Sequence, residues 1–174
     1  ETLRAIWQCS TSGPVGSEAI GRGSPRPMRI DYTAPPHVRD VIAGLGRTED
    51  VKFSPSNRRL AIAGFRQQKI AVFDISIGVS PHGPTIALTD AAEIFSSHLK
   101  NPHGLDFIDD ETIIVANRKG NAVILKLPPG ELGGNRYELE PLQVIGADGF
   151  LAAPGSVSVT RKDRNVYEAL ICNN

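Results

Sequence analysis

The chain has 174 residues, with 19 basic and 19 acidic side chains, so its formal net charge is zero. A non-specific nucleic-acid binder needs excess positive charge to displace counterions from phosphates, so this balance argues against nucleic acid as a partner. No apolar run approaches the roughly 18–20 residues that a membrane-spanning helix needs, which argues against a membrane protein. An apolar content of 40% is sufficient for a globular core.

The first 27 residues are expected to form a loop-rich segment with one strand. The strand is expected at residues 3–9, LRAIWQC, and the Gly-, Ser- and Pro-rich stretch after it has the composition of a loop. Residues 28–32 and 37–42 are predicted to be outer strands of a blade that precedes the first clear repeat. The chain begins at Glu1 and shows no secretory signal, and the sequence leaves the compartment unknown.

The two cysteines, Cys9 and Cys172, lie at opposite ends of the chain. No C-x-x-C pair is present, so a zinc ribbon or a thioredoxin-type motif has no support. Two free thiols are favoured over a disulfide, and both interpretations stay open.

Three segments from residue 51 onward resemble one another. Each reads as an alternating apolar strand, a polar turn and a more continuous apolar strand; they are residues 51–75, 102–127 and 154–174. Anchored on Phe53, Phe107 and Val159, the spacings are 54 and 52 residues. A period near 50 with three or four short strands predicts β-propeller blades, because a single small sheet cannot cover both of its own faces and must stack on its neighbours.

The outer part of each unit is less regular. Residues 84–88 and 137–145 are predicted to supply the fourth, outer strands. Residues 89–100, TDAAEIFSSHLK, fit a short helix with Asp90 as its N-cap, and they fit an extended outer strand followed by a loop almost as well.

The predicted fold is therefore all-β, a partial β-propeller over residues 28–174. Its blade repeats lie near residues 51–100, 102–150 and 154–174. Closed propellers have four to eight blades, so about three blades predict a ring that is incomplete within this chain. Further chain, a partner chain or self-association through exposed blade edges is expected to complete it.

Particular stretches resemble known propeller repeats. The stretch PHGLDFIDDETIIVAN, residues 102–117, resembles the NHL and YVTN type, in which Pro-x-Gly precedes the inner strand. The stretches FSPSNRRLAIAG and KIAVFDI resemble a WD-repeat blade, with Phe73-Asp74 in place of Trp-Asp. This resemblance implies a propeller scaffold, on which functions vary widely.

A more distant similarity connects the chain with the gluconolactonase group of lactone hydrolases. That resemblance implies a divalent metal held by Glu, Asn and Asp side chains near the propeller axis. The chain has His103 where the group's repeat has Asn, and Asn117-Arg118 where Asp-Ser often follows the second strand. The metal ligands are therefore unmatched, and no catalytic residue is assigned.

The loops that lead into the inner strands and those between the second and third strands should open on one face of a propeller. We expect this face to bind a protein or a small polar ligand through side chains near the axis: Asp50, Arg66, His103, Asn117, Arg118 and Asn173. The leading hypothesis is a non-enzymatic scaffold without a cofactor. The alternative is a metal-dependent lactonase-like hydrolase.

Overall fold

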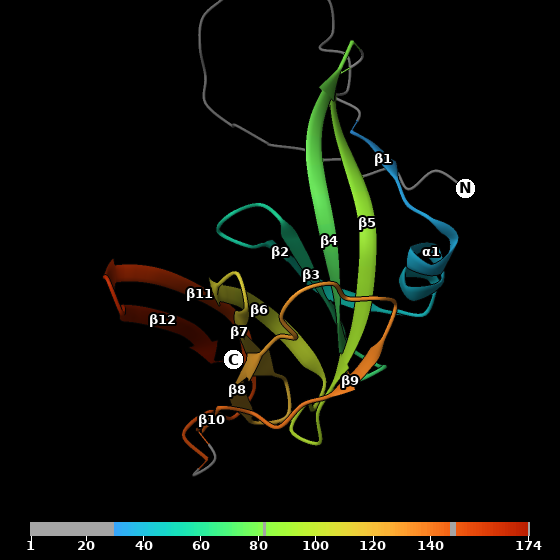
Figure 1. Ribbon diagram of the computed structural model, residues 1–174. Helices are drawn as coiled ribbons and strands as arrows, with labels where there is room; N and C mark the ends of the chain where they lie inside the picture. Colours follow the sequence, from blue (N-terminus) through green and yellow to red (C-terminus); the bar gives the residue numbers. More distant parts are fainter. Residues whose placement is uncertain (1–29, 82, 147–148, 174) are drawn as a thin grey trace, which may run out of the picture.

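The computed structural model describes residues 30–81, 83–146 and 149–173, and this part of the chain consists mostly of β-strands (Figure 1). An all-β fold is thereby confirmed. The strands form three sheets, none of which closes on itself. The expected strand at residues 3–9 and Cys9 lie outside the described residues.

The first sheet is an antiparallel meander with two short parallel strands on its outer edge. The meander strands are β2 (Thr48–Phe53), β3 (Arg59–Gly64), β4 (Lys69–Ser80) and β5 (Gly83–Phe95). The outer edge of β5 pairs in parallel with β1 (Asp31–Thr33) and with β9 (Arg136–Glu138).

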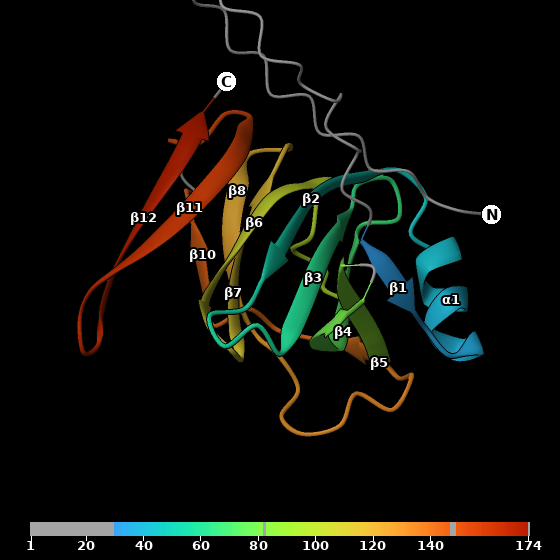
Figure 2. The same ribbon diagram turned by 90° about the horizontal axis from the view of Figure 1, so that it is seen from above.

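The second sheet is an antiparallel meander like the first. The third sheet has two strands, which correspond to the first two strands of such a meander. The second consists of β6 (Pro102–Asp109), β7 (Thr112–Asn117), β8 (Asn121–Lys126) and β10 (Gln143–Ile145). The third pairs β11 (Pro154–Asp163) with β12 (Val166–Asn173). Figure 2 shows the three sheets following one another across the molecule.

Burial follows from this order, because among the described sheets only the middle one has another sheet on both faces. Every residue of β7 is buried, which explains its apolar run IIVA. One apolar cluster lies between the first and second sheets and includes Ile70, Val72, Leu105 and Val115. Another lies between the second and third sheets, around Ile114 and Val157.

The outer face of the first sheet is covered by α1 (Pro36–Ala43), whose Val38 is fully buried against β4 and β5. The prediction of a strand over residues 37–42 is therefore wrong. Pro36 at the first turn favours a helix, since its missing N–H is not needed there. Val38, Val41 and Ile42 are then spaced to lie on one helical face.

The other outer segments also depart partly from expectation. Residues 89–95 continue β5, so the helix is wrong and the extended alternative fits; the expected strand at 84–88 belongs to the same β5. Residues 137–145 divide between β9, which joins the first sheet, and β10, which joins the second. The strand expected at 28–32 is β1, which starts at Asp31 and pairs with β5 rather than forming a separate blade.

The described residues include no helix long and apolar enough to cross a membrane.

Candidate ligand-binding loop face

Loops from all three sheets meet at the starts of β2, β6 and β11, which we call the inner strands, and we call this surface the loop face. It comprises residues 45–49, 64–68, 98–103, 117–120 and 151–155. Backbone and side-chain contacts connect them: Phe65 N donates to Arg47 O, Asn101 Nδ2 donates to Phe65 O, and Arg118 Nη1 donates to Ala153 O. The convergence expected from the sequence is thus present in the geometry.

His103 lies at the centre of this face but is held by the protein itself. Its Nδ1 lies 3.1 Å from the carbonyl oxygen of Gly155, and its Nε2 lies 3.6 Å from Glu49 Oε2. The ring also meets Phe65 edge-on, with 6.1 Å between ring centroids. Both ring nitrogens therefore face protein acceptors, so His103 connects β6 with the loops on either side.

Asn117 and Asn173 perform the same structural task in successive sheets. Each pairs in register with the proline that begins the inner strand, Pro102 or Pro154. Asn117 Oδ1 accepts a hydrogen bond from Lys100 N, and Asn117 is fully buried. Asn173 Oδ1 accepts hydrogen bonds from the preceding loop in the same way. These side chains fix the loops and leave little for a ligand.

Asp50 also has a structural role. Its Oδ2 accepts a hydrogen bond from Leu105 N on β6, at 3.0 Å, and its Oδ1 accepts one from Val51 N. Asp106 repeats the device by accepting a hydrogen bond from Val159 N on β11, at 2.8 Å. These carboxylates therefore join the inner strands of neighbouring sheets.

The remaining predicted residues, Arg66 and Arg118, are accompanied by further cations, of which Arg47 and Lys100 were not predicted at this face. Arg66 is exposed at the β3–β4 turn and Arg118 is half-buried at the β7–β8 turn. Cationic groups from three sources share the loop face with them: Arg47, Lys100 and Lys119. Arg47 directly precedes β2, and that position was the available signal for it.

The carboxylate among these loop residues is Glu49, which is mostly enclosed. It pairs with Arg47 through Oε1, an oxygen that is otherwise buried without a hydrogen-bond partner among the described residues. The Arg47 guanidinium also lies over the Phe65 ring, 4.7 Å from its centroid. Because Glu49 is enclosed and the cations are exposed, the loop face presents positive charge to solvent.

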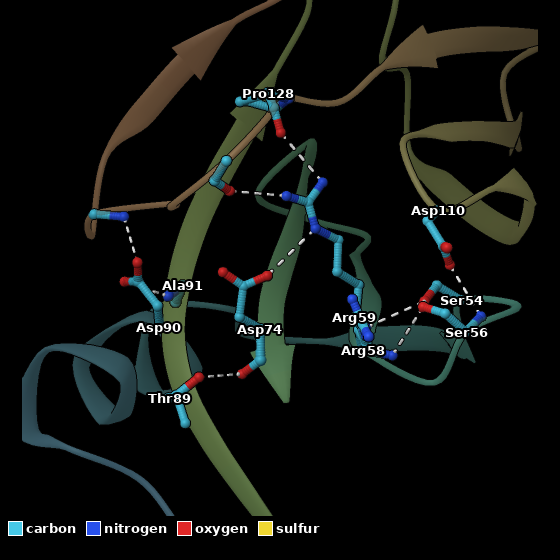
Figure 3. Close-up of polar contacts among 12 residues, drawn as sticks. Ser54, Ser56, Arg58, Arg59, Asp74, Thr89, Asp90, Ala91, Asp110 and Pro128 are labelled. Carbon is cyan, nitrogen blue, oxygen red and sulfur yellow. Dashed lines mark hydrogen bonds and ion pairs between the residues drawn. The ribbon is translucent and has the colours of Figure 1, made fainter. Parts of the chain in front are cut away.

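A second polar cluster lies at the opposite end of the sheets (Figure 3). Arg59 is 8% exposed; it pairs with Asp74 and donates to the carbonyl oxygens of Pro128 and Gly130. Arg59 therefore fastens the loop after β8 to the first sheet. An open hollow of about 690 Å³ beside this cluster is lined by residues that include Asp74, Asp90 and Glu131.

The two aspartates of this cluster, paired in register across β4 and β5, have opposite pKa shifts. Burial raises the pKa of Asp74, with Arg59 opposing and nearby acidic groups reinforcing the rise. Burial also acts to raise the pKa of Asp90, but hydrogen bonds from the N–H groups of Gly133, Ala91 and Gly134 and from His37 hold it below its usual range. Both carboxylates are thus accounted for by local contacts.

Within the described ranges, no three His, Cys, Asp or Glu side chains gather in a way that could hold a metal ion. The predicted absence of a cofactor remains a prediction. Cys172 is an exposed free thiol.

Comparison with known proteins adds no family assignment. No protein-family model matches the chain, and no curated protein matches it at a significant level.

Proposed function

We propose that the protein is a non-enzymatic scaffold of the β-propeller type, in which the three sheets are successive blades. Two features support this. The first two sheets are antiparallel meanders in chain order, and their inner strands adjoin the next sheet through Asp50 and Asp106. The residues joined by these bonds are 55 and 53 positions apart, close to the repeat period of the sequence.

The loop face is the binding surface of this scaffold, and its ligand is an acidic segment of a protein partner. The observation that carries this proposal is the charge distribution: Arg47, Arg66 and Lys119 are exposed on the loop face, whereas its carboxylate, Glu49, is already paired with Arg47. Cations on exposed loops suit an extended acidic chain, whereas small-molecule sites are usually enclosed and mostly apolar.

The test uses a fluorescein-labelled hexaglutamate peptide, with hexalysine as the probe of opposite charge. Fluorescence anisotropy should show binding of hexaglutamate that weakens as salt is added. The double variant Arg66→Glu/Lys119→Glu should weaken hexaglutamate binding about tenfold or more. Each charge reversal removes an attraction of about 0.5–1 kcal/mol and adds a repulsion of similar size. Neither side chain has a hydrogen bond or ion pair among the described residues, so the fold should tolerate both changes.

The control is Lys162→Glu/Arg164→Glu, which makes the same charge change at the β11–β12 hairpin, at the other end of the sheets, and also removes the exposed ion pair of Lys162 with Glu168. It should leave hexaglutamate affinity within about twofold of the wild type once long-range charge effects are screened. Equal losses in both variants, or no binding of hexaglutamate by the wild type, would contradict the proposed surface.

The lactonase alternative gains no specific support. Asn117, at a position that the resemblance would bring near the axis, is buried and bonded to Lys100, His98 and Asn121. We therefore do not propose lactonase activity for this protein.

A further inference from the structure

The hairpin of β4 and β5 extends well beyond β2 and β3 and forms an arm (Figure 1). Along one face of β4, burial falls steadily toward the tip. Phe73 is 0% exposed and Ile75 7%, whereas Ile77 is 50% and Val79 88% exposed. Ile77 continues the apolar face that α1 covers lower on the sheet. The arm therefore carries a core face out into solvent.

The two edges of this arm differ in whether another segment of the chain pairs with them. The outer edge of β5 is covered by β1, by the loop that bonds Gly134 N to Ala91 O, and by β9. On the other side, β3 accompanies β4 only as far as Asp74. In the described part of the chain no strand pairs with β4 on that side between Ile77 and Val79.

The backbone groups on this uncovered edge can be identified from the hydrogen-bond pattern. Ile75 N donates to Arg58 O, at 2.8 Å, so its backbone points toward the β3 side. Strand backbones alternate with a period of two, so the N–H and C=O groups of Ile77 and Val79 point the same way. They face away from β5. On that side of β4, an open hollow of about 540 Å³ is lined by residues that include Ser56, Arg58 and residues 74–77.

The sequence of this edge is almost its own mirror image. Residues 76–80 read Ser-Ile-Gly-Val-Ser, centred on Gly78. If two copies pair antiparallel about Gly78, Ile77 of each copy lies opposite Val79 of the other, and the two residues exchange both backbone hydrogen bonds. Gly78 then meets its own counterpart at the closer, non-hydrogen-bonded position. Charged residues and proline usually protect an edge strand from pairing with another chain, and this segment contains neither.

We propose that the β4 arm is a homodimerisation site, at which β4 pairs antiparallel with β4 of a second copy around a two-fold axis at Gly78. The first sheets of two molecules then form one continuous sheet. Its exposed apolar face joins Tyr32, Ile86 and Ile77 of one copy to Val79 of the other. A self-complementary surface of this kind is what an isologous interface requires. Because the contact is small, the dimer should dissociate on dilution.

Sedimentation velocity over a concentration series up to the sub-millimolar range tests this proposal. The wild type should pass from monomer to dimer as concentration rises. Val79→Lys and the double variant Ile77→Lys/Val79→Lys should raise the dissociation constant at least about tenfold, because lysine on an open edge opposes pairing. Both side chains are at least half exposed, so far-UV circular dichroism should match the wild type.

A charge-swap variant tests the register itself. In Ile77→Lys/Val79→Glu, the introduced lysine of one copy lies opposite the introduced glutamate of the other at both positions. Dimerisation should return to within about threefold of the wild type and become sensitive to salt. General apolar stickiness would not be rescued in this way.

Leu170→Lys is the matched control, because Leu170 is 74% exposed on β12, another edge of the molecule. It should leave the dimer intact. A wild type that stays monomeric throughout, a Val79→Lys variant that dimerises normally, or dissociation caused by Leu170→Lys instead would overturn the proposal.

Discussion

Replacing Gly104 with alanine tests how closely the second and third sheets approach each other. Gly104 lies on β6, where the backbone of β11 passes directly over it. A Cβ atom added at Gly104 would lie 2.3 Å from the carbonyl oxygen of Gly155, 2.8 Å from Ser156 Cα and 2.9 Å from Val157 N. All three contacts are to backbone, so no side-chain rotation can relieve them. The two strands would have to separate by about 1 Å to restore ordinary contact.

The expected cost follows from this geometry. Overpacking a core position typically costs about 1–3 kcal/mol, and contacts to backbone place Gly104→Ala in the upper part of that range, at about 2–3 kcal/mol. Separating the strands also lengthens the hydrogen bonds from His103 to Gly155 and from Val159 to Asp106. With a denaturant slope of about 2 kcal/mol/M, the urea midpoint should fall by about 1–1.5 M.

Urea unfolding followed by circular dichroism provides the measurement, and Gly44→Ala provides the control. Gly44 has an ordinary helical φ of −78°, and an added Cβ there would lie 3.3 Å from its nearest neighbour, Asp40 O. We expect that change to stay within about 0.5 kcal/mol of the wild type. If Gly104→Ala were equally mild, the close stacking of β6 on β11 would be wrong.

Two further predictions concern polar side chains. Asn117→Ala should lower the free energy of unfolding by about 2–4 kcal/mol, because it leaves buried hydrogen-bond partners unsatisfied. Asn173→Ala, the same change at the exposed counterpart, should cost about 1 kcal/mol or less. Equal costs in urea unfolding would contradict the different burial of the two side chains. The pKa of Asp90 is held below its usual range, so its ionised form stabilises the fold above the unfolded-state pKa, and this contribution is lost as pH falls through the folded-state pKa. Asp90→Asn should therefore flatten the acid limb of a plot of urea midpoint against pH below about pH 4, and an unchanged limb would refute this assignment.

The repeat could be read from the sequence because burial imposes it on residue type. Phe107 and Val159 fall at equivalent positions of β6 and β11, opposite Ile113 and Ala169, as the pairing registers show. The second and third sheets each bury the same side of their inner strand against the preceding sheet, so apolar residues recur at one period. The all-β architecture was predictable for that reason.

The segments outside the repeat were less predictable, because their partners are distant in sequence. β9 was predicted within an outer strand of the second unit, yet it pairs with residues 93–95 of β5 in the first sheet. Short polar strands such as Arg136–Glu138 carry too little alternation to reveal which edge they cover. α1 was missed although a sequence signal was present: residues 37–42 were predicted as an outer strand, whereas Pro36 at the first turn is typical of a helix start.

For the loop face, residue type identified the loops but not the state of each side chain. Asp50, His103 and Asn117 are the polar groups that chemistry would select first, and the structure shows that each is engaged by neighbouring backbone. A buried polar group must find a partner, so polar residues near a strand end are often used for the fold itself. The cations Arg66 and Lys119 are exposed to solvent, so they do not need a hydrogen-bond partner within the protein.

The net charge of the chain does not reveal the exposed cations on the loop face, because it is a sum over the whole surface and a partner would contact only one part of that surface. The chain is neutral as a whole, yet Glu49 is paired with Arg47 and lies beside His103, while Arg66 and Lys119 are exposed on the same face. An acidic segment approaching these loops therefore meets a positive surface, although the molecule carries no net charge. The uncharged edge at Ile77 and Val79 is a separate surface, so binding at the loop face and pairing through the β4 arm can be tested independently.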